Sequence, residues 1–220
     1  MLVRDYMSQP PIVISPITPV SEALKMMRER GIRRLPVVDS AGSLVGIVSD
    51  RDLLHAEPSP ATSLSIWEIT YLLGRITVEQ VMTRDVLTVS PTTPLEDAAE
   101  IMVDRKIGGL PVIEADRVIG VITETDIFRV FALLLGAHEP GTSVTAIVTD
   151  RPGLLADLTG ATARAGGDIT AIGTYPADEG TNKTSVFLKV KGVSREQLTE
   201  AIRPHVERIE EMREAEGGPR

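Results

Sequence analysis

Two hydroxyl–carboxylate pairs occur at matching places in the chain. Ser49 and Asp52 stand three residues apart in GIVSDRDL, and Thr123 and Asp126 have the same spacing in GVITETDI. At the mouth of a helix, such a hydroxyl can donate a hydrogen bond to a phosphate, and the carboxylate can accept from both hydroxyls of a ribose. The same spacing also forms a helix cap, which stabilises a helix start by about 1 kcal/mol without any ligand. Because the pair recurs after a strand led by glycine, the sequence favours a binding site, with the cap as the alternative.

The two pairs belong to a tandem duplication. Residues 3–39 align without a gap onto residues 78–114 with 13 identical positions in 37, and the likeness continues into the two pairs after a one-residue deletion. Each copy is too short to bury its own apolar face, so the two copies are expected to pack together. Their packing predicts a pseudo-symmetric cleft, which is the kind of place where small molecules bind.

Each copy has the pattern of a strand, a helix, two strands and a second helix. The first copy is expected to contain, in order, a strand over 12–14, a helix capped by Thr18 with Pro19 at its first position and ended by Gly31, strands over 35–38 and 44–48, and a helix from Asp50. The second copy repeats this order, and Thr93 is expected to cap its first helix.

A linker over 58–76 separates the copies, and the stretch EPSPATS at 57–63 is turn-rich. The linker includes an amphipathic stretch that predicts a helix over about 64–74. This helix is expected either to connect the repeats by lying against them or, through Trp67 and Tyr71, to form an oligomer contact.

A separate domain follows the duplication. The predicted division of the chain is a first repeat over 1–57, the linker with its helix over 58–76, a second repeat over 77–136, a short linker over 137–142, a β-α-β-β-α-β domain over 143–214 and a disordered tail over 215–220. That order of elements builds a four-stranded antiparallel sheet with both helices on one face. The expected fold class is therefore α+β, a mixed α/β chain with a pseudo-symmetric module and a ferredoxin-like domain.

Composition excludes several classes of function. Cysteine is absent, which excludes disulfides, thiolate metal sites and a cysteine nucleophile. The net charge of −8 and an aromatic content of 3% argue against nucleic acid as a partner. His55, His138 and His205 are scattered, so we expect surface residues and no metal site. The sequence contains neither a membrane span nor a signal-peptide pattern, which predicts a soluble cytoplasmic protein without membrane contact.

The duplicated segments resemble a pair of CBS domains, the modules that bind adenine nucleotides. LPVVDSAGSLVGIVSDRDL and LPVIEADRVIGVITETDI carry this resemblance. The last segment resembles an ACT domain through DRPGLL and through GGDI at 166–169. A CBS pair followed by an ACT domain is similar to the AcuB-type acetoin-utilisation proteins. This resemblance implies a non-catalytic regulatory sensor with AMP, ADP, ATP or S-adenosylmethionine as its ligand and no catalytic cofactor.

The CBS resemblance assigns roles to several residues. It implies that Asp52 and Asp126 contact ribose and that Ser49 and Thr123 contact phosphate or ribose. The basic side chains expected to neutralise phosphates are Arg33, Arg34 and Arg51. The second repeat has Gly108 and Gly109 where the first has the arginine pair, so the two sites are expected to differ. Weaker candidates for the slot that holds adenine are Val13 and Thr88, for which an ordinary strand role remains the alternative.

In the ACT-like segment, the loop before the first helix is the candidate site for an amino-acid effector. Gly153 would let a ligand approach the free amides at the start of that helix closely. The resemblance implies binding there, often across a dimer interface, by Asp150, Gly153, Leu154, Asp168 and Ile169. A domain that only mediates dimerisation is the alternative.

Three functions follow from these patterns. The favoured one is a homodimeric regulatory module that binds an adenine nucleotide and acts on a protein that the sequence does not identify. A passive scaffold without a ligand is the second. A nucleotide hydrolase is the least favoured, because the chain offers no metal-holding cluster or base placed for attack.

Overall fold

The structure is a computed structural model that describes residues 1–55, 76–178 and 180–215. The helix expected over 64–74, with Trp67 and Tyr71, lies outside the described residues, as does most of the predicted tail. The described chain divides into two compact units, Met1–Ile127 and Phe128–Arg220. The division falls inside one helix, so the last part of the predicted second repeat belongs to the second unit.

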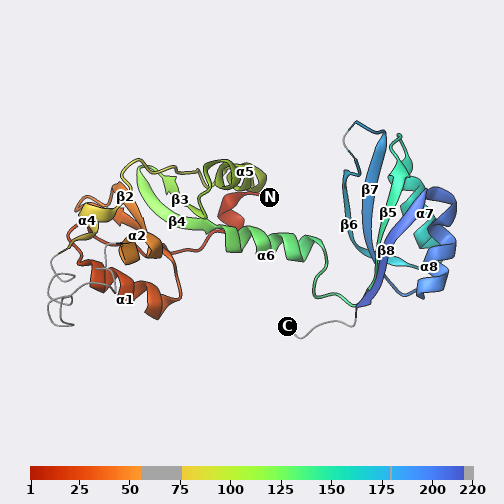
Figure 1. The fold of residues 1–220 in the computed structure, drawn as a ribbon, viewed down its shortest axis with the longest axis horizontal. Helices are drawn as coiled ribbons and strands as arrows, with labels where there is room; N and C mark the ends of the chain where they lie inside the picture. Colours follow the sequence, from red (N-terminus) through yellow and green to blue (C-terminus); the bar gives the residue numbers. More distant parts are fainter. Residues whose placement is uncertain (56–75, 179, 216–220) are drawn as a thin grey trace. The chain divides into compact units, whose positions relative to one another are not determined.

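In the first unit, both repeats fold alike (Figure 1). The elements of the first repeat are η1 (Val3–Asp5), α1 (Val20–Arg30), β1 (Arg34–Val38), β2 (Leu44–Ser49) and α2 (Asp50–His55). Those of the second are α4 (Val78–Val81), α5 (Leu95–Arg105), β3 (Gly109–Glu114), β4 (Arg117–Thr123) and α6 (Glu124–Leu134). Each strand pair is an antiparallel hairpin, and each hairpin shifts register at an equivalent place, after Val37 and after Val112.

Two local predictions were wrong. The first helix of each repeat begins one residue later than expected, at Val20 and at Leu95, and Pro19 and Pro94 are the N-cap residues without a side-chain cap. Both prolines have ψ 142°, which is extended backbone, so the helix can begin only at the next residue. The strand expected over 12–14 is reduced to one bridge between Ile14 and Val37.

Reciprocal contacts join the two repeats. Ile47 of β2 forms a bridge with Thr83 of the second repeat, and Val121 of β4 forms the equivalent bridge with Ser8 of the first. Beside these bridges a methyl group at Gly46 would lie 2.5 Å from the Met82 sulfur. One at Gly120 would lie 2.6 Å from the Met7 sulfur. Gly46 and Gly120 are the first residues of GIVSDRDL and GVITETDI. A side chain at either position would collide with a methionine of the other repeat, so glycine is needed there.

The core around the first repeat includes side chains of the second. Its fully or nearly buried members are Ile14, Val20, Ala23, Leu24, Met27, Leu35, Val37, Val48, Leu53, Val78 and Met82. The apolar face predicted for the first helix, Val20, Ala23, Leu24 and Met27, is thus the buried face of α1. Because Val78 and Met82 complete this core, the first repeat does not bury its apolar surface alone, as expected for a duplicated unit.

The second unit contains the predicted order of elements. They are β5 (Gly141–Thr149), α7 (Leu154–Arg164), β6 (Asp168–Pro176), β7 (Lys183–Lys191), α8 (Arg195–Ile202), η2 (Arg203–His205) and β8 (Arg208–Ala215). The strands form one antiparallel sheet in the order β6-β7-β5-β8. Figure 1 shows α7 and α8 on the same face of this sheet. The residues buried between these helices and the sheet include Leu158, Val186, Leu188 and Leu198.

Candidate functional site

In the first repeat, Ser49 and Asp52 form a closed hydrogen-bonded pair at the junction of β2 and α2. Oδ2 of Asp52 accepts from the Ser49 amide at 2.8 Å and from its hydroxyl at 2.7 Å. The Asp52 amide donates back to the Ser49 hydroxyl at 3.2 Å. Within the part of the chain that the structure describes, no hydrogen bond is made by the second carboxylate oxygen, Oδ1. One oxygen therefore fixes the side chain while the other keeps its capacity to accept from a ligand.

Thr123 and Asp126 form the same cap between β4 and α6. Oδ2 of Asp126 accepts from the Thr123 amide at 3.0 Å and from its hydroxyl at 2.6 Å. The two sites differ in exposure, since Asp126 is 6% exposed and Asp52 is only partly buried. The capping alternative is thus present in both repeats, and ligand binding by either carboxylate stays a prediction.

A cleft of about 470 Å³ opens beside the first pair. The residues that line it come from both repeats and are Arg33, Arg34, Ile47, Ser49, Asp50, Arg51, Asp52, Thr83, Asp85, Val86, Leu87, Lys106, Ile107, Gly108 and Gly109. Five of the residues predicted for nucleotide binding, namely Ser49, Asp52 and the three arginines, therefore share one cleft. Thr123 and Asp126 do not line it.

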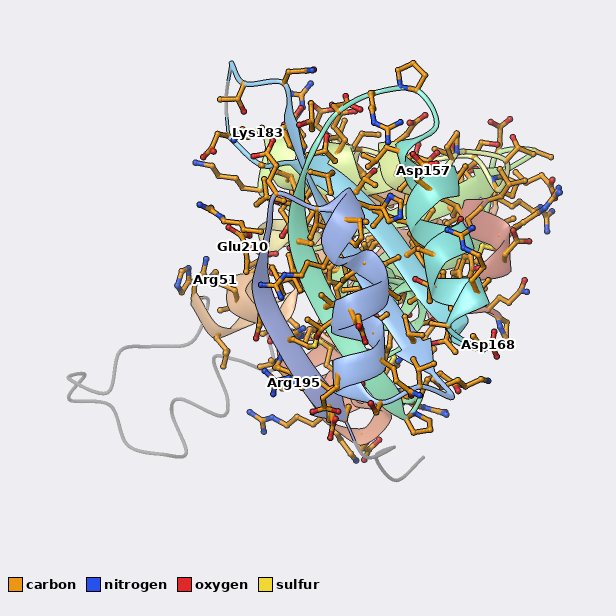
Figure 2. The ribbon with its side chains drawn as sticks, turned by 90° about the vertical axis from the view of Figure 1, so that its right-hand side faces the viewer. Arg51, Asp157, Asp168, Lys183, Arg195 and Glu210 are labelled. Atoms are coloured by element: carbon orange, nitrogen blue, oxygen red, sulfur yellow. The ribbon has the colours of Figure 1, made fainter. Side chains whose placement is uncertain are left out.

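Local pairing explains why the arginines lie beside the capped aspartate. Arg34 at the start of β1 stands opposite Ser49 at the end of β2 in the hairpin register. The Asp50 amide at the start of α2 donates to the Arg33 carbonyl at 3.0 Å. The hairpin therefore brings the chain after α1 against the helix start that carries Asp52, and Arg51 extends from that same helix (Figure 2).

The lining of the cleft carries a small excess of positive charge, whereas the whole chain is acidic. Its lining has four cationic side chains, those of the three arginines and Lys106, against three carboxylates, those of Asp50, Asp52 and Asp85. The formal charge of the whole chain is −8. Because interactions between charges strengthen where water is partly excluded, this local excess favours an anionic group in the cleft.

Sequence reasoning missed the contribution of the second repeat to this cleft. Thr83, Asp85 and Lys106 were not singled out, although residues 83–87 follow the bridge to β2 and could be located from the repeat alignment. The two adenine candidates lie elsewhere. Val13 lines a separate groove with residues of α1, and Thr88 is exposed next to Leu87, which does line the cleft.

The residues predicted to bind an amino acid separate into two groups. Thr149 at the end of β5 pairs with Lys183, whereas Asp168 pairs with Lys191 at the other end of β7. Asp150, Gly153 and Leu154 therefore lie at one end of the sheet, and Asp168 and Ile169 at the other, roughly 25 Å away at about 3.3 Å per residue. Figure 2 shows Lys183 and Asp168 toward opposite ends of the sheet. Within one chain these five residues do not form one site.

Each of these two ends of the sheet carries an ion pair. Near the α7 N-terminus, Arg151 is hydrogen-bonded to Asp157 and lowers the pKa of that carboxyl. At the other end, Asp168 pairs with Lys191 at 3.3 Å beside a hollow of about 440 Å³. His138, Glu139 and Thr170 also line that hollow.

Two features are absent from the described residues. Across residues 1–55, 76–178 and 180–215, no group of three or more His, Asp or Glu side chains is placed to hold a metal ion. Over the same ranges, no helix combines the length and the apolar character needed to cross a membrane.

Comparison with known proteins identifies the first unit. The family model of the CBS domain matches residues 3–59 and 78–133, which together make up more than half of the chain. A CBS domain-containing protein of Dictyostelium discoideum is 35% identical over 141 residues, which are 64% of this chain and 95% of that protein. The chain belongs to the CBS domain family and contains a tandem pair of these domains.

Solved structures show the same fold for the pair. The CBS domain pair of protein MJ0100, in complex with 5′-methylthioadenosine and S-adenosyl-L-methionine, is 33% identical, covers 60% of this chain and 96% of that chain, and has a TM-score of 0.51. A putative acetoin utilization protein (AcuB) from Vibrio cholerae is 33% identical, covers 62% and 93%, and has a TM-score of 0.52. The reported matches thus cover about three fifths of the chain.

Some relatives are enzymes, but they share only a part with this chain. L-aspartate semialdehyde sulfurtransferase of Methanocaldococcus jannaschii is 34% identical over 131 residues, which are 59% of this chain and 23% of the enzyme. CBS pairs are generally regulatory modules without catalytic activity. The likeness to this enzyme therefore does not transfer its activity.

Proposed function

We propose that this protein is a non-catalytic regulatory sensor that binds an adenosyl ligand in the cleft of its CBS pair. The observation that carries the proposal is that one cleft joins the capped Ser49–Asp52 pair to three arginines. Oδ1 of Asp52, which makes no hydrogen bond to the described residues, accepts from the ribose hydroxyls, and the guanidinium groups neutralise a phosphate. The complex of the similar MJ0100 pair with two adenosyl compounds supports this ligand class.

The two halves of the pair differ in this proposal. Asp52 lines an open cleft, whereas Asp126 is 6% exposed and lies outside that cleft. The second repeat also has glycines where the first has Arg33 and Arg34. We therefore assign tight binding to the half that contains Asp52 and weaker or no binding to the half that contains Asp126.

Isothermal titration calorimetry on the full chain tests the proposal. The ligands are AMP, ADP, ATP and S-adenosylmethionine, titrated into the wild type, Asp52→Ala and the matched Asp126→Ala. We expect Asp52→Ala to lower the affinity for the tightest-binding ligand at least tenfold, because the ribose loses a charged acceptor. Asp126→Ala should change that affinity less than threefold. Absence of binding by the wild type contradicts the sensor and leaves a passive scaffold.

A nucleotide hydrolase remains the least favoured function. The cleft holds carboxylates and basic side chains but no histidine, and no metal-holding group occurs in the chain as far as the structure describes it. If the wild type converted ATP to ADP and phosphate, and Asp52→Ala or Asp126→Ala abolished that turnover, a hydrolase would become the favoured function.

For the second unit we propose an ACT-like domain that dimerises through β6. This strand is an edge of the sheet, and its Ile172 and Tyr175 are 43% and 52% exposed. Antiparallel pairing of two β6 strands about a two-fold axis places the start of one beside the end of the other. Asp168 and Ile169 of one copy then approach the loop over 150–154 of its partner, so an amino-acid site requires the dimer.

Sedimentation equilibrium tests this arrangement. We expect a dimer for the wild type and a shift toward monomer for Tyr175→Asp, because the substitution puts a charge on the pairing edge. Thr159→Asp, on the exposed surface of α7, is the matched control. A monomeric wild type would rule out the shared amino-acid site. An AcuB-type role in regulating a partner enzyme would then rest on the CBS pair alone.

A further inference from the structure

Gly108 leaves open a space that the side chain of Arg34 occupies. The glycine is buried just before β3 and lines the cleft. A methyl group at this position would overlap Nη2 of Arg34 and would lie 2.9 Å from its Cζ atom and 2.6 Å from Oε2 of Glu124. Real side-chain carbons do not approach heavy atoms that closely, so any side chain at position 108 must displace the guanidinium or the carboxylate.

Space rather than backbone freedom explains this glycine. Gly108 does not have a positive φ, so an alanine could adopt its backbone conformation. The neighbouring Gly109 also faces Arg34, since a methyl group there would lie 3.6 Å from the Arg34 Cδ atom. The side chain of Arg34 therefore runs along the backbone of both glycines.

Arg34 of the first repeat thus lies against the equivalent positions of the second repeat. Gly108 and Gly109 occupy in the second repeat the positions that Arg33 and Arg34 occupy in the first. The start of each second helix is bound in the same way, because the Glu124 amide donates to the Gly108 carbonyl at 3.2 Å as the Asp50 amide does to Arg33. An arginine at position 108 would fill the space of Arg34 and bring two like charges together.

We propose that Gly108 determines the preference of the cleft for a phosphorylated adenosyl ligand, because it keeps Arg34 in position to contact the phosphate. This inference rests on the proposed function and adds the ligand class, an adenosine 5′-phosphate in preference to an uncharged adenosyl thioether. The ribose contact through Ser49 and Asp52 is independent of Gly108, so both ligands retain it.

The test compares two ligands that differ at the 5′ position. AMP and 5′-methylthioadenosine are titrated by calorimetry into the full-length wild type, Gly108→Ala, Arg34→Met and the double variant. We expect Gly108→Ala and Arg34→Met each to lower the affinity for AMP about tenfold, the usual effect of losing a hydrogen bond to a charged group. The affinity of both variants for 5′-methylthioadenosine should stay within about twofold of the wild-type value. The double variant should bind AMP no more weakly than Arg34→Met, because both changes remove one interaction.

Gly160→Ala on α7 is the matched control, because the nearest atom to a methyl group there is Nη1 of Arg164, at 3.3 Å and at the end of a flexible side chain. A Gly108→Ala variant that weakens both ligands equally overturns the proposal, because the glycine would then serve folding alone. Equal weakening of both ligands by Arg34→Met overturns it too, even if Gly108→Ala fails to fold. A wild type that binds 5′-methylthioadenosine as tightly as AMP overturns this inference but leaves the sensor intact. A wild type that binds neither ligand overturns both.

Discussion

The carboxylate of Glu207 joins three strands at one end of the C-terminal sheet. It accepts hydrogen bonds from Lys183 on β7 and from the Thr149 hydroxyl on β5, immediately before β8 begins. These bonds, that of Lys183 foremost, lower the pKa of the Glu207 carboxyl below its usual value. A lowered pKa in the folded state contributes stability above the unfolded pKa, and this contribution is lost as the pH falls through the folded pKa.

We therefore expect the free energy of unfolding of Glu207→Gln to depend less on pH in the acidic range than that of the wild type. The variant should be less stable than the wild type at neutral pH, and the difference should shrink as the pH falls below about 4.5, where the carboxyl is protonated first in the unfolded chain and then, at lower pH, in the folded protein. Urea unfolding at several pH values measures it. Glu214→Gln, an exposed carboxylate further along β8, serves as the control. A difference that is constant with pH would contradict the assignment to ionisation.

A hydrogen bond from Lys189 connects the end of α6 to the sheet of the second unit. Lys189 of β7 is 4% exposed and donates to the Gly136 carbonyl at 2.6 Å. Gly136 ends the helix with φ 62°, a left-handed conformation that glycine adopts without strain. A cation suits this place because the carbonyl end of a helix carries partial negative charge.

Replacing Lys189 by methionine should destabilise this unit. The change keeps a similar apolar stem but removes a buried charge-assisted hydrogen bond, which contributes about 1.5–3 kcal/mol. Lys191→Met on the same strand removes an exposed ion pair with Asp168 and should cost less than about 1 kcal/mol. Urea unfolding of both variants makes the comparison. Equal losses would show that the helix end does not depend on Lys189.

A cleft built from both repeats predicts how a ligand protects the backbone. Hydrogen exchange of the full chain with saturating AMP should slow in 46–53 and also in 83–87 and 106–109, because all three segments contribute lining residues. Protection of 46–53 alone would contradict a shared cleft.

If the CBS pair regulates the second unit, exchange should also change within 141–215, since α6 continues across the division of the chain. Unchanged exchange there would leave a binding module without transmission.

Much of the fold could be predicted from the sequence because its signals are local or repeated. The apolar face of α1, the β-α-β-β-α-β order and the duplication depend on neighbouring residues or on direct comparison of the two copies. The hydroxyl–carboxylate spacing likewise indicated the caps that Asp52 and Asp126 make. The helix starts were less predictable, because Thr18 and Thr93 fit a capping pattern that the extended conformation of the following proline excludes.

By itself, the sequence determined that a hydroxyl–carboxylate pair recurs in both copies, that only the first copy carries the arginine pair, and that the two copies must pack together. Only the tertiary structure decided that Asp52 lies in an open cleft while Asp126 is buried, that residues 83–87 complete the cleft, and that Asp168 lies far from Asp150. The physical reason is that the spacing of residues along one element follows its own backbone geometry. Exposure and convergence depend instead on how side chains from distant segments pack, as Arg34 does in the space left by Gly108.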